Sequence, residues 1–259
     1  MKKGKIKQVT GLKTAPPLIL HIPHASTHIP FTDGYLDEKT TALEIQLLTD
    51  WYTDELFANK RDTIIQANFS RVFCDVERFA QDEIEPMSAK GMGVAYTHCD
   101  DGTLLRNLTS ELQGSILKGY YDPHHQRLND VVDESVKRIG NAKIIDCHSY
   151  PDVPLMRDID QTRPRPDFNI GIDTFHTPKT WIELSRNFFE KHGCSLGINW
   201  PYSGTMVPTK AFKSNPKVHS IMLEINRKLY LKPDNPAKNN AFDQIRTIVQ
   251  DWLSLIHLN

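Results

Sequence analysis

The segment spanning residues 143–150 constrains the fold of this chain more than any other. It starts with the apolar pair Ile144 and Ile145 and runs directly into Asp146 and His148. A buried strand that ends in polar side chains is typical of open α/β sheets, which build their sites at the carboxyl ends of strands. We interpret His148 as a metal ligand and Asp146, two residues earlier on the same strand face, as its orienting carboxylate. The alternative is a core histidine hydrogen-bonded at a strand end.

The rest of the chain alternates between short apolar runs and helical patterns. The sequence predicts strands over residues 18–22, 63–68, 72–76, 168–172, 195–200 and 219–225. It predicts helices over residues 37–57, 112–139 (interrupted near Pro123), 178–192 and 240–257, and a long loop over residues 79–101. Residues 1–16 are polar and basic, and we expect them to form a mobile leader. Because the elements alternate with short links and no repeat, we predict one α/β domain over residues 1–259, with a mostly parallel or mixed sheet covered by helices.

Charge and cysteine usage exclude several classes of function. The 31 Lys and Arg residues nearly cancel the 32 Asp and Glu residues, which gives no support for nucleic-acid or membrane-surface binding. No apolar segment has the length of a signal peptide or a membrane span. The four cysteines are scattered without a CxxC pair, so we expect a reducing, cytoplasmic location. Phosphate-binding loops and the GxSxG motif of serine hydrolases are also missing from the sequence.

A second histidine, His24, follows another predicted strand, so two strand-end histidines can meet at one crevice. A catalytic zinc ion commonly has two histidines and one carboxylate as ligands. Asp50 and Asp54, one turn apart on a predicted helix, are the candidates for that carboxylate. Their alternative interpretation is a solvated helix face. We interpret His21 and His28 as solvated loop histidines.

Three further charged residues stand in unusual surroundings. Glu224 lies within an apolar run, where a carboxylate is costly unless it is paired. Such a group is either a general base with a perturbed pKa or one half of a buried ion pair, for example with Arg227. Arg71 and Arg78 flank the predicted strand over residues 72–76. They are suited to bind a carboxylate or an oxyanion, or they are surface cations on an edge strand.

Six segments together resemble the N-formylglutamate amidohydrolase family, which is related to the zinc carboxypeptidases. They occur in the family's order: Leu18-Ile-Leu-His-Ile-Pro-His24-Ala-Ser with Ile29-Pro30, Thr49-Asp50-Trp51, Phe69-Ser-Arg71-Val-Phe-Cys-Asp75-Val-Glu-Arg78, Asp146-Cys-His148-Ser149, Pro166-Asp-Phe-Asn-Ile-Gly171, and Leu223-Glu224 with Leu229-Tyr230. The resemblance implies a phosphorylase/hydrolase-like three-layer α/β sandwich. It also implies metal-dependent hydrolysis of the amide bond of a small N-acyl amino acid such as N-formylglutamate.

The resemblance assigns the central roles residue by residue. His24 and His148 match the metal-binding histidines, and Asp50 matches the acidic third ligand. Zn²⁺ is the default for this set, although another divalent transition metal fits the same ligands. Glu224 matches the general base, and Arg71 matches the arginine that holds the oxyanion or the substrate.

The resemblance also implies which residues bind the substrate. Arg78, with Lys210, is expected to bind a substrate carboxylate, and Ser149 to line the site. Glu77 stands where the family pattern has Asn, which adds a negative charge where an anionic substrate would bind. Two functions remain as alternatives, namely a carboxypeptidase-like hydrolase of peptides or amidated acids and a metal- or amino-acid-binding regulator without turnover. An ordinary α/β protein with structural histidines is the third alternative.

Overall fold

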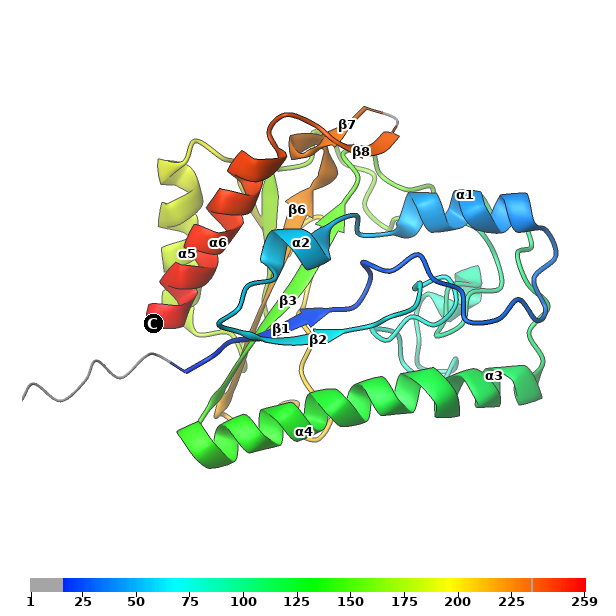
Figure 1. The fold of residues 1–259 in the computed structure, drawn as a ribbon, viewed down its shortest axis with the longest axis horizontal. Coiled ribbons are helices and arrows are strands. Elements are labelled where there is room, and N and C mark those ends of the chain that lie inside the picture. Colours follow the sequence, from blue (N-terminus) through cyan, green and yellow to red (C-terminus); the bar gives the residue numbers. More distant parts are fainter. Residues whose placement is uncertain (1–15, 234) are drawn as a thin grey trace, which may run out of the picture.

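A six-stranded mixed sheet forms the centre of the molecule (Figure 1). The computed structural model describes residues 16–233 and 235–259, so all of the predicted leader except its last residue lies outside the described residues. The strand order is β2-β1-β3-β6-β4-β5. The strands are β1 (Ile19–Ile22), β2 (Thr63–Gln66), β3 (Ala142–Tyr150), β4 (Phe168–Gly171), β5 (Leu196–Ile198) and β6 (Val218–Asn226). β4 runs antiparallel to β6, and the other neighbouring strands are parallel.

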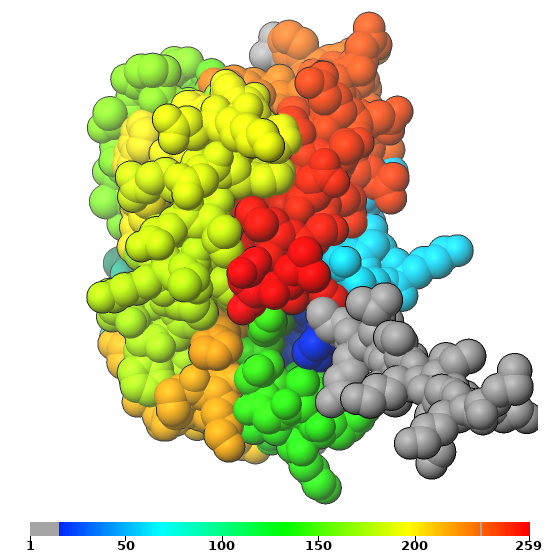
Figure 2. Space-filling model, turned by 90° about the vertical axis from the view of Figure 1, so that its left-hand side faces the viewer, coloured from blue at the N-terminus to red at the C-terminus, as the bar shows by residue number. Residues whose placement is uncertain are grey.

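Helices cover both faces of this sheet. The α-helices of the described residues are α1 (Glu38–Leu48), α2 (Thr53–Phe57), α3 (Ser110–Ile116), α4 (Asp122–Ile139), α5 (Lys179–Lys191) and α6 (Phe242–Leu258). α4 lies along one face, while α2, α5 and α6 cover the other (Figure 1). Figure 2 shows α5 and α6 side by side on the outer surface of that second layer. A small antiparallel hairpin, β7 (Leu231–Lys232) and β8 (Asn235–Lys238), precedes α6. The predicted three-layer α/β architecture with a mixed sheet is confirmed.

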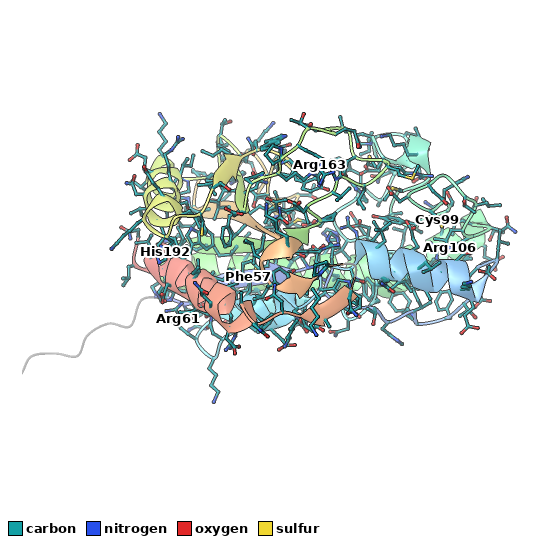
Figure 3. All side chains as sticks on the ribbon, turned by 90° about the horizontal axis from the view of Figure 1, so that it is seen from above. Phe57, Arg61, Cys99, Arg106, Arg163 and His192 are labelled. Carbon is teal, nitrogen blue, oxygen red and sulfur yellow. The ribbon has the colours of Figure 1, made fainter. Side chains whose placement is uncertain are left out.

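Each face of the sheet has its own hydrophobic core. On the α4 face, Leu128 and Val132 pack against apolar side chains from β1 and β3. On the other face, α6 contributes a buried stripe that includes Trp252, and Phe57 of α2 lies beside it (Figure 3). Because β3 and β6 are buried along almost their whole length, they form the rigid centre that fixes the site.

Irregular segments build the end of the molecule away from α5. Cys99 and Arg106 lie at this end, opposite His192 at the end of α5 (Figure 3). Residues 69–109 contain only a 3₁₀ turn at Ser88–Lys90 as a regular element, as predicted for the long loop over residues 79–101. Between α3 and α4 the helix continues through a π-type turn at Leu117–Tyr121, close to the interruption predicted near Pro123. In the described parts of the chain, no helix combines the length and apolarity needed to cross a membrane.

Two predicted elements are wrong. The single helix over residues 37–57 is divided into α1 and α2, because Thr49 turns to an extended backbone and Tyr52 adopts a left-handed conformation with φ of 62°. The predicted strand over residues 72–76 is a series of turns, in which the Asp75 N–H donates to the Val94 carbonyl instead of to a sheet neighbour. Arg71 and Arg78 therefore do not flank an edge strand.

Candidate metal centre and active site

Three adjacent parallel strands carry the central residues of the site. His24 follows β1, His148 lies near the carboxyl end of β3, and Glu224 is its partner in the register of β6. All three side chains are buried, and the rings of His24 and His148 lie 5.1 Å apart between centroids. Because parallel strands end at the same sheet edge, the two predicted histidines and the predicted base meet in one place.

The break between α1 and α2 positions Asp50 beside His24 and His148. The Asp50 N–H donates to the His24 carbonyl at 3.0 Å, which ties this break to the end of β1. The Oδ2 atom of Asp50 lies 3.1 Å from His148 Nδ1 and 3.6 Å from His24 Nδ1. Asp54 instead lies on α2, partly exposed, and bonds to the neighbouring Glu55 N–H. The two aspartates do not share a helix face, and only Asp50 contacts the histidines.

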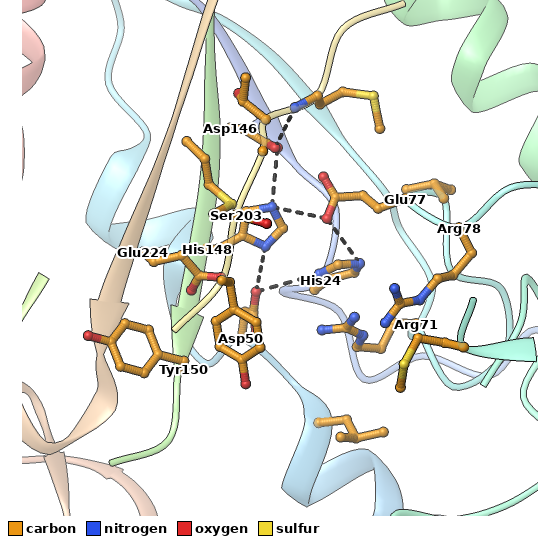
Figure 4. A pocket seen from close by; sticks show the side chains of 18 of the residues that line it. His24, Asp50, Arg71, Glu77, Arg78, Asp146, His148, Tyr150, Ser203 and Glu224 are labelled. Atoms are coloured by element: carbon orange, nitrogen blue, oxygen red, sulfur yellow. Dashed lines mark hydrogen bonds and ion pairs between the residues drawn. The ribbon is translucent and has the colours of Figure 1, made fainter. Parts of the chain in front are cut away.

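Carboxylates hold the far side of each histidine ring. His24 Nε2 bonds to Asp75 Oδ1 at 2.8 Å. His148 Nε2 lies 3.2 Å from Asp146 Oδ1 (Figure 4). Asp146 is itself fixed by the N–H of Met206. Burial alone would raise the pKa of Asp75, but Arg71 and His24 hold that pKa well below its usual range. Each ring therefore has a carboxylate at Nε2 and turns Nδ1 toward Asp50, the arrangement that ligand histidines commonly show.

The donor set fits a divalent transition metal. Two ligands of a tetrahedral zinc ion, each about 2.1 Å from it, lie about 3.4 Å apart. The two Nδ1-to-Asp50 distances, 3.1 and 3.6 Å, bracket that value. In the described part of the chain, His24 Nδ1 is buried without a hydrogen-bond partner, which a metal ion would supply. His24, His148 and Glu77 form a second possible set, with donor atoms within 4.8 Å of one another.

Glu224 has the environment expected of a general base. It is 6% exposed, and its Oε2 has no hydrogen-bond partner among the residues that the structure describes. Burial, together with the nearby Asp50 carboxylate, raises the pKa of Glu224 to about 8. The alternative ion pair with Arg227 is not formed, because the Arg227 guanidinium donates to Asp50 Oδ1 at 2.8 Å. Arg227 also donates to Ser149 Oγ, so Ser149 is held at the edge of the site.

The arginines differ in how tightly they are held. Arg71 donates to Asp75 Oδ2 from two nitrogens, at 2.9 and 3.2 Å, and to the Tyr96 hydroxyl. Arg78 approaches Asp75 and Glu85 only to 3.7 Å, and its buried Nε has no hydrogen-bond partner within the described residues. Of the two, Arg78 has more capacity left for a ligand.

A cavity of about 510 Å³ opens over these groups. Both arginines, Ser149, His24, Asp50, His148 and Glu224 line it, together with apolar side chains such as Met87, Met92 and Leu155. Lys210 is exposed on the loop after β5 and is not among the lining residues. Its role in carboxylate binding stays a prediction that no contact supports.

Sequence reasoning missed several members of this cluster. His21 is fully buried within β1 and bonds to Asp146 Oδ1 at 2.8 Å, so its interpretation as a solvated loop histidine is wrong. Its position within the apolar run Leu20-His21-Ile22 was the available signal of burial. Asp75 and Arg227 could not be paired with His24 and Asp50 from sequence, because these contacts join segments 51 and 177 residues apart.

Comparison with known proteins adds to this geometry. A family model described as N-formylglutamate amidohydrolase matches residues 16–231. The solved structure of N-formylglutamate amidohydrolase from Ralstonia eutropha JMP134 is 22% identical, covers 94% of each chain and superposes with a TM-score of 0.82. The gene product Atu2144 from Agrobacterium tumefaciens is 17% identical, covers 93% of this chain and 92% of its own, and gives a TM-score of 0.64. At these identities the two structures show a common fold. Among curated protein sequences, none matches this chain.

Proposed function

Because the chain belongs to the N-formylglutamate amidohydrolase family, we propose that it hydrolyses the amide bond of an N-acyl amino acid with the help of a divalent metal ion. The products are a carboxylic acid and the free amino acid. The convergence of His24, Asp50 and His148 beside the unpartnered carboxylate of Glu224 carries this proposal. Such a set combines a Lewis-acid site with a base in one water-accessible cavity.

His24 Nδ1, Asp50 Oδ2 and His148 Nδ1 would hold the cation. We favour Asp50 over Glu77 as the third ligand because Asp75 bonds to His24 Nε2 and Asp146 lies beside His148 Nε2. A cation bound there would activate a water molecule and polarise the amide carbonyl. Asp75, hydrogen-bonded to His24 Nε2, keeps that ring in the required orientation and tautomer, and Asp146 places a negative charge beside the His148 ring.

Glu224 acts as the proton carrier. Its carboxylate accepts a proton from the attacking water and returns it to the nitrogen of the leaving amine. Burial makes Glu224 a stronger base than an exposed glutamate, since its pKa rises to about 8. The register of β3 and β6 places it directly beside His148.

The arginines bind the charged parts of the substrate. Arg71, fixed by Asp75 and Tyr96, presents a positive charge to the oxyanion that forms at the carbonyl carbon. Arg78 binds a carboxylate of the amino acid through its free donor capacity. A second candidate function is carboxypeptidase-like hydrolysis of a peptide or amidated acid. The cavity of about 510 Å³, with its apolar lining, favours this candidate because it admits acyl groups much larger than formyl.

The decisive experiment compares substrates with and without metal. Protein stripped by a chelator and reloaded with Zn²⁺ is assayed for amine release from formyl, acetyl and succinyl amino acids and from short peptides. We expect turnover of an N-acyl amino acid that disappears on stripping and returns on reloading. Preference for short peptides would favour the second candidate function, and full activity without metal would exclude the metal-dependent mechanism.

Replacement of the base tests the same proposal within the site. We expect Glu224→Gln to lower kcat by about 10²- to 10⁴-fold, the usual contribution of a general base. Zinc content measured by elemental analysis should stay unchanged, because Glu224 is not among the proposed ligands. A Glu224→Gln protein with full turnover would contradict the assigned role.

A further inference from the structure

Glu77 lies beside three histidine rings near the carboxyl ends of β1 and β3. Its Oε2 is 3.1 Å from His148 Nε2 and 3.8 Å from His24 Nε2, and its Oε1 is 3.6 Å from His21 Nδ1 (Figure 4). Within residues 16–233 and 235–259, the Glu77 carboxylate accepts no hydrogen bond and has no lysine or arginine within 4.0 Å. The N–H groups of these three rings are therefore the donors that bear on its role.

In two of the three rings, the nitrogen that faces Glu77 already has another acceptor. His24 Nε2 bonds to Asp75 Oδ1 at 2.8 Å, and His21 Nδ1 bonds to Asp146 Oδ1 at 2.8 Å. An ionised carboxylate only accepts hydrogen bonds, so both nitrogens donate. Each bond is shorter than the contact of the same nitrogen with Glu77. Neither ring therefore has an N–H left for Glu77.

His124 of α4 satisfies the other nitrogen of His21. The Nε2 atoms of the two rings lie 3.0 Å apart. Burial lowers the pKa of His124 to about 2, so His124 is a neutral imidazole that can donate from Nε2. His21 then accepts at Nε2 and donates from Nδ1, which uses both of its nitrogens without Glu77.

His148 is the remaining donor. Its Nε2 is buried and has no hydrogen-bond partner among the described residues. Asp146 Oδ1, 3.2 Å away, already accepts from His21, and Asp146 Oδ2 accepts the Met206 N–H. Glu77 Oε2 lies 3.1 Å away, which is a hydrogen-bond length. The contact lacks only alignment, and rotation of the partly exposed Glu77 side chain supplies it.

We propose that Glu77 is the positioning residue of His148: its carboxylate accepts the Nε2–H of this ring and keeps Nδ1 directed at the cation site. A histidine that binds a cation through Nδ1 carries its proton on Nε2, and a carboxylate acceptor there fixes the ring and makes Nδ1 a stronger ligand. Asp75 does the same for His24, so two acids of one segment each hold one ring. The inference rests on the metal site of the proposed function, but not on which amide is hydrolysed.

Zinc affinity tests the role of Glu77. The dissociation constant of tag-free protein is measured by competition with a chromophoric chelator. Loss of the partner of a ligand histidine weakens metal binding, by about 10-fold for Glu77→Gln, which keeps an uncharged acceptor, and by about 100-fold for Glu77→Ala. Glu83→Gln removes an exposed acid of the same loop and should keep the parent affinity. Parent affinity in both Glu77 variants would overturn the proposal.

Nuclear magnetic resonance separates positioning from a general structural effect. Zinc-saturated protein with isotope-labelled histidine should show the His148 Nε2–H proton at low field, identified by its loss in His148→Gln. In Glu77→Gln this resonance should move upfield, because an amide accepts more weakly than a carboxylate, while the Nε2–H resonance of His24 stays in place. An unchanged His148 resonance in Glu77→Gln would overturn the proposal.

Visible absorption of the Co²⁺-loaded protein checks that Glu77 is not itself a ligand. The bands of Glu77→Gln should keep the intensity of the parent bands, and a changed intensity, which follows the number and geometry of the ligands, would contradict a positioning role. A parent that binds zinc but hydrolyses no amide would contradict the proposed function alone. A parent that binds no zinc would contradict both.

Discussion

The site side chains at the strand ends and those on the connecting segments differ in whether their polar atoms have hydrogen-bond or ion-pair partners. His24, His148 and Glu224, at the ends of the strands, each have a buried atom without a hydrogen-bond partner among the described residues. Asp50 and Asp75, from connecting segments, are both paired with arginines. An unsatisfied buried group costs about 1–3 kcal/mol and persists where a ligand completes it. The strand ends therefore carry the side chains with unused hydrogen-bonding or ligand atoms. The connecting segments supply the paired carboxylates that orient those side chains.

Replacement of a connecting-segment acid that contacts both histidines should have the largest effect on activity. Asp50→Asn removes a ligand charge and leaves Arg227 without its carboxylate partner. We expect turnover to fall by at least about 10²-fold together with metal affinity, since one of three ligands is lost. Activity is measured at increasing Zn²⁺ concentrations.

Asp54→Asn is the matched control for this experiment. Asp54 lies four residues later, is partly exposed and does not contact the histidines. It should leave metal affinity and turnover near the parent values. If the two variants behaved alike, the assignment of Asp50 as a ligand would be wrong, and Glu77 would become the preferred third ligand.

Asp75 tests the orienting role of the connecting segments through stability. Asp75→Asn removes the charge of the fully buried partner of Arg71, and breaking a buried ion pair costs about 3–5 kcal/mol. We expect a loss of about 3 kcal/mol in the free energy of unfolding of metal-free protein, measured by urea denaturation. The exposed pair Arg138–Glu134 supplies the control, because Glu134→Gln should change stability little. Equal effects of the two variants would mean that the Asp75–Arg71 pair contributes no more to stability than the exposed pair does.

The same division explains how much of the site could be predicted from sequence. His148 and Glu224 were found because a polar residue at the end of, or within, an apolar run is a local signal. The break before Tyr52 was missed because helical periodicity continues through it, whereas the Asp50-to-His24 backbone bond that holds it is non-local. The predicted strand over residues 72–76 has the right apolar pattern, but its backbone partner Val94 lies in the long loop, which no periodicity marks.

The acid Glu44 tests whether a raised pKa alone marks a functional carboxylate. Glu44 of α1 is 5% exposed, lies outside the cavity lining and accepts the Asp100 N–H at 2.8 Å. Burial raises the pKa of Glu44 from 4.5 to about 7. The folded protein therefore keeps a proton that the unfolded chain releases between pH 4.5 and 7, so the contribution of Glu44 to stability falls as the pH rises through that window.

Of the three replacements, that of Glu44 should have the smallest effect. It should change the free energy of unfolding in a direction that the raised pKa of Glu44 fixes. Glu44→Gln keeps the acceptor for Asp100 and cannot ionise, so it should match the parent near pH 4. At pH 8 it should be more stable by about 1 kcal/mol, less than the full shift implies because solvent screens part of the charge. Urea denaturation at both pH values measures this, and turnover should be unchanged. A loss of activity in Glu44→Gln would mean that a carboxylate of α1, and not only the side chains at the strand ends, takes part in the reaction.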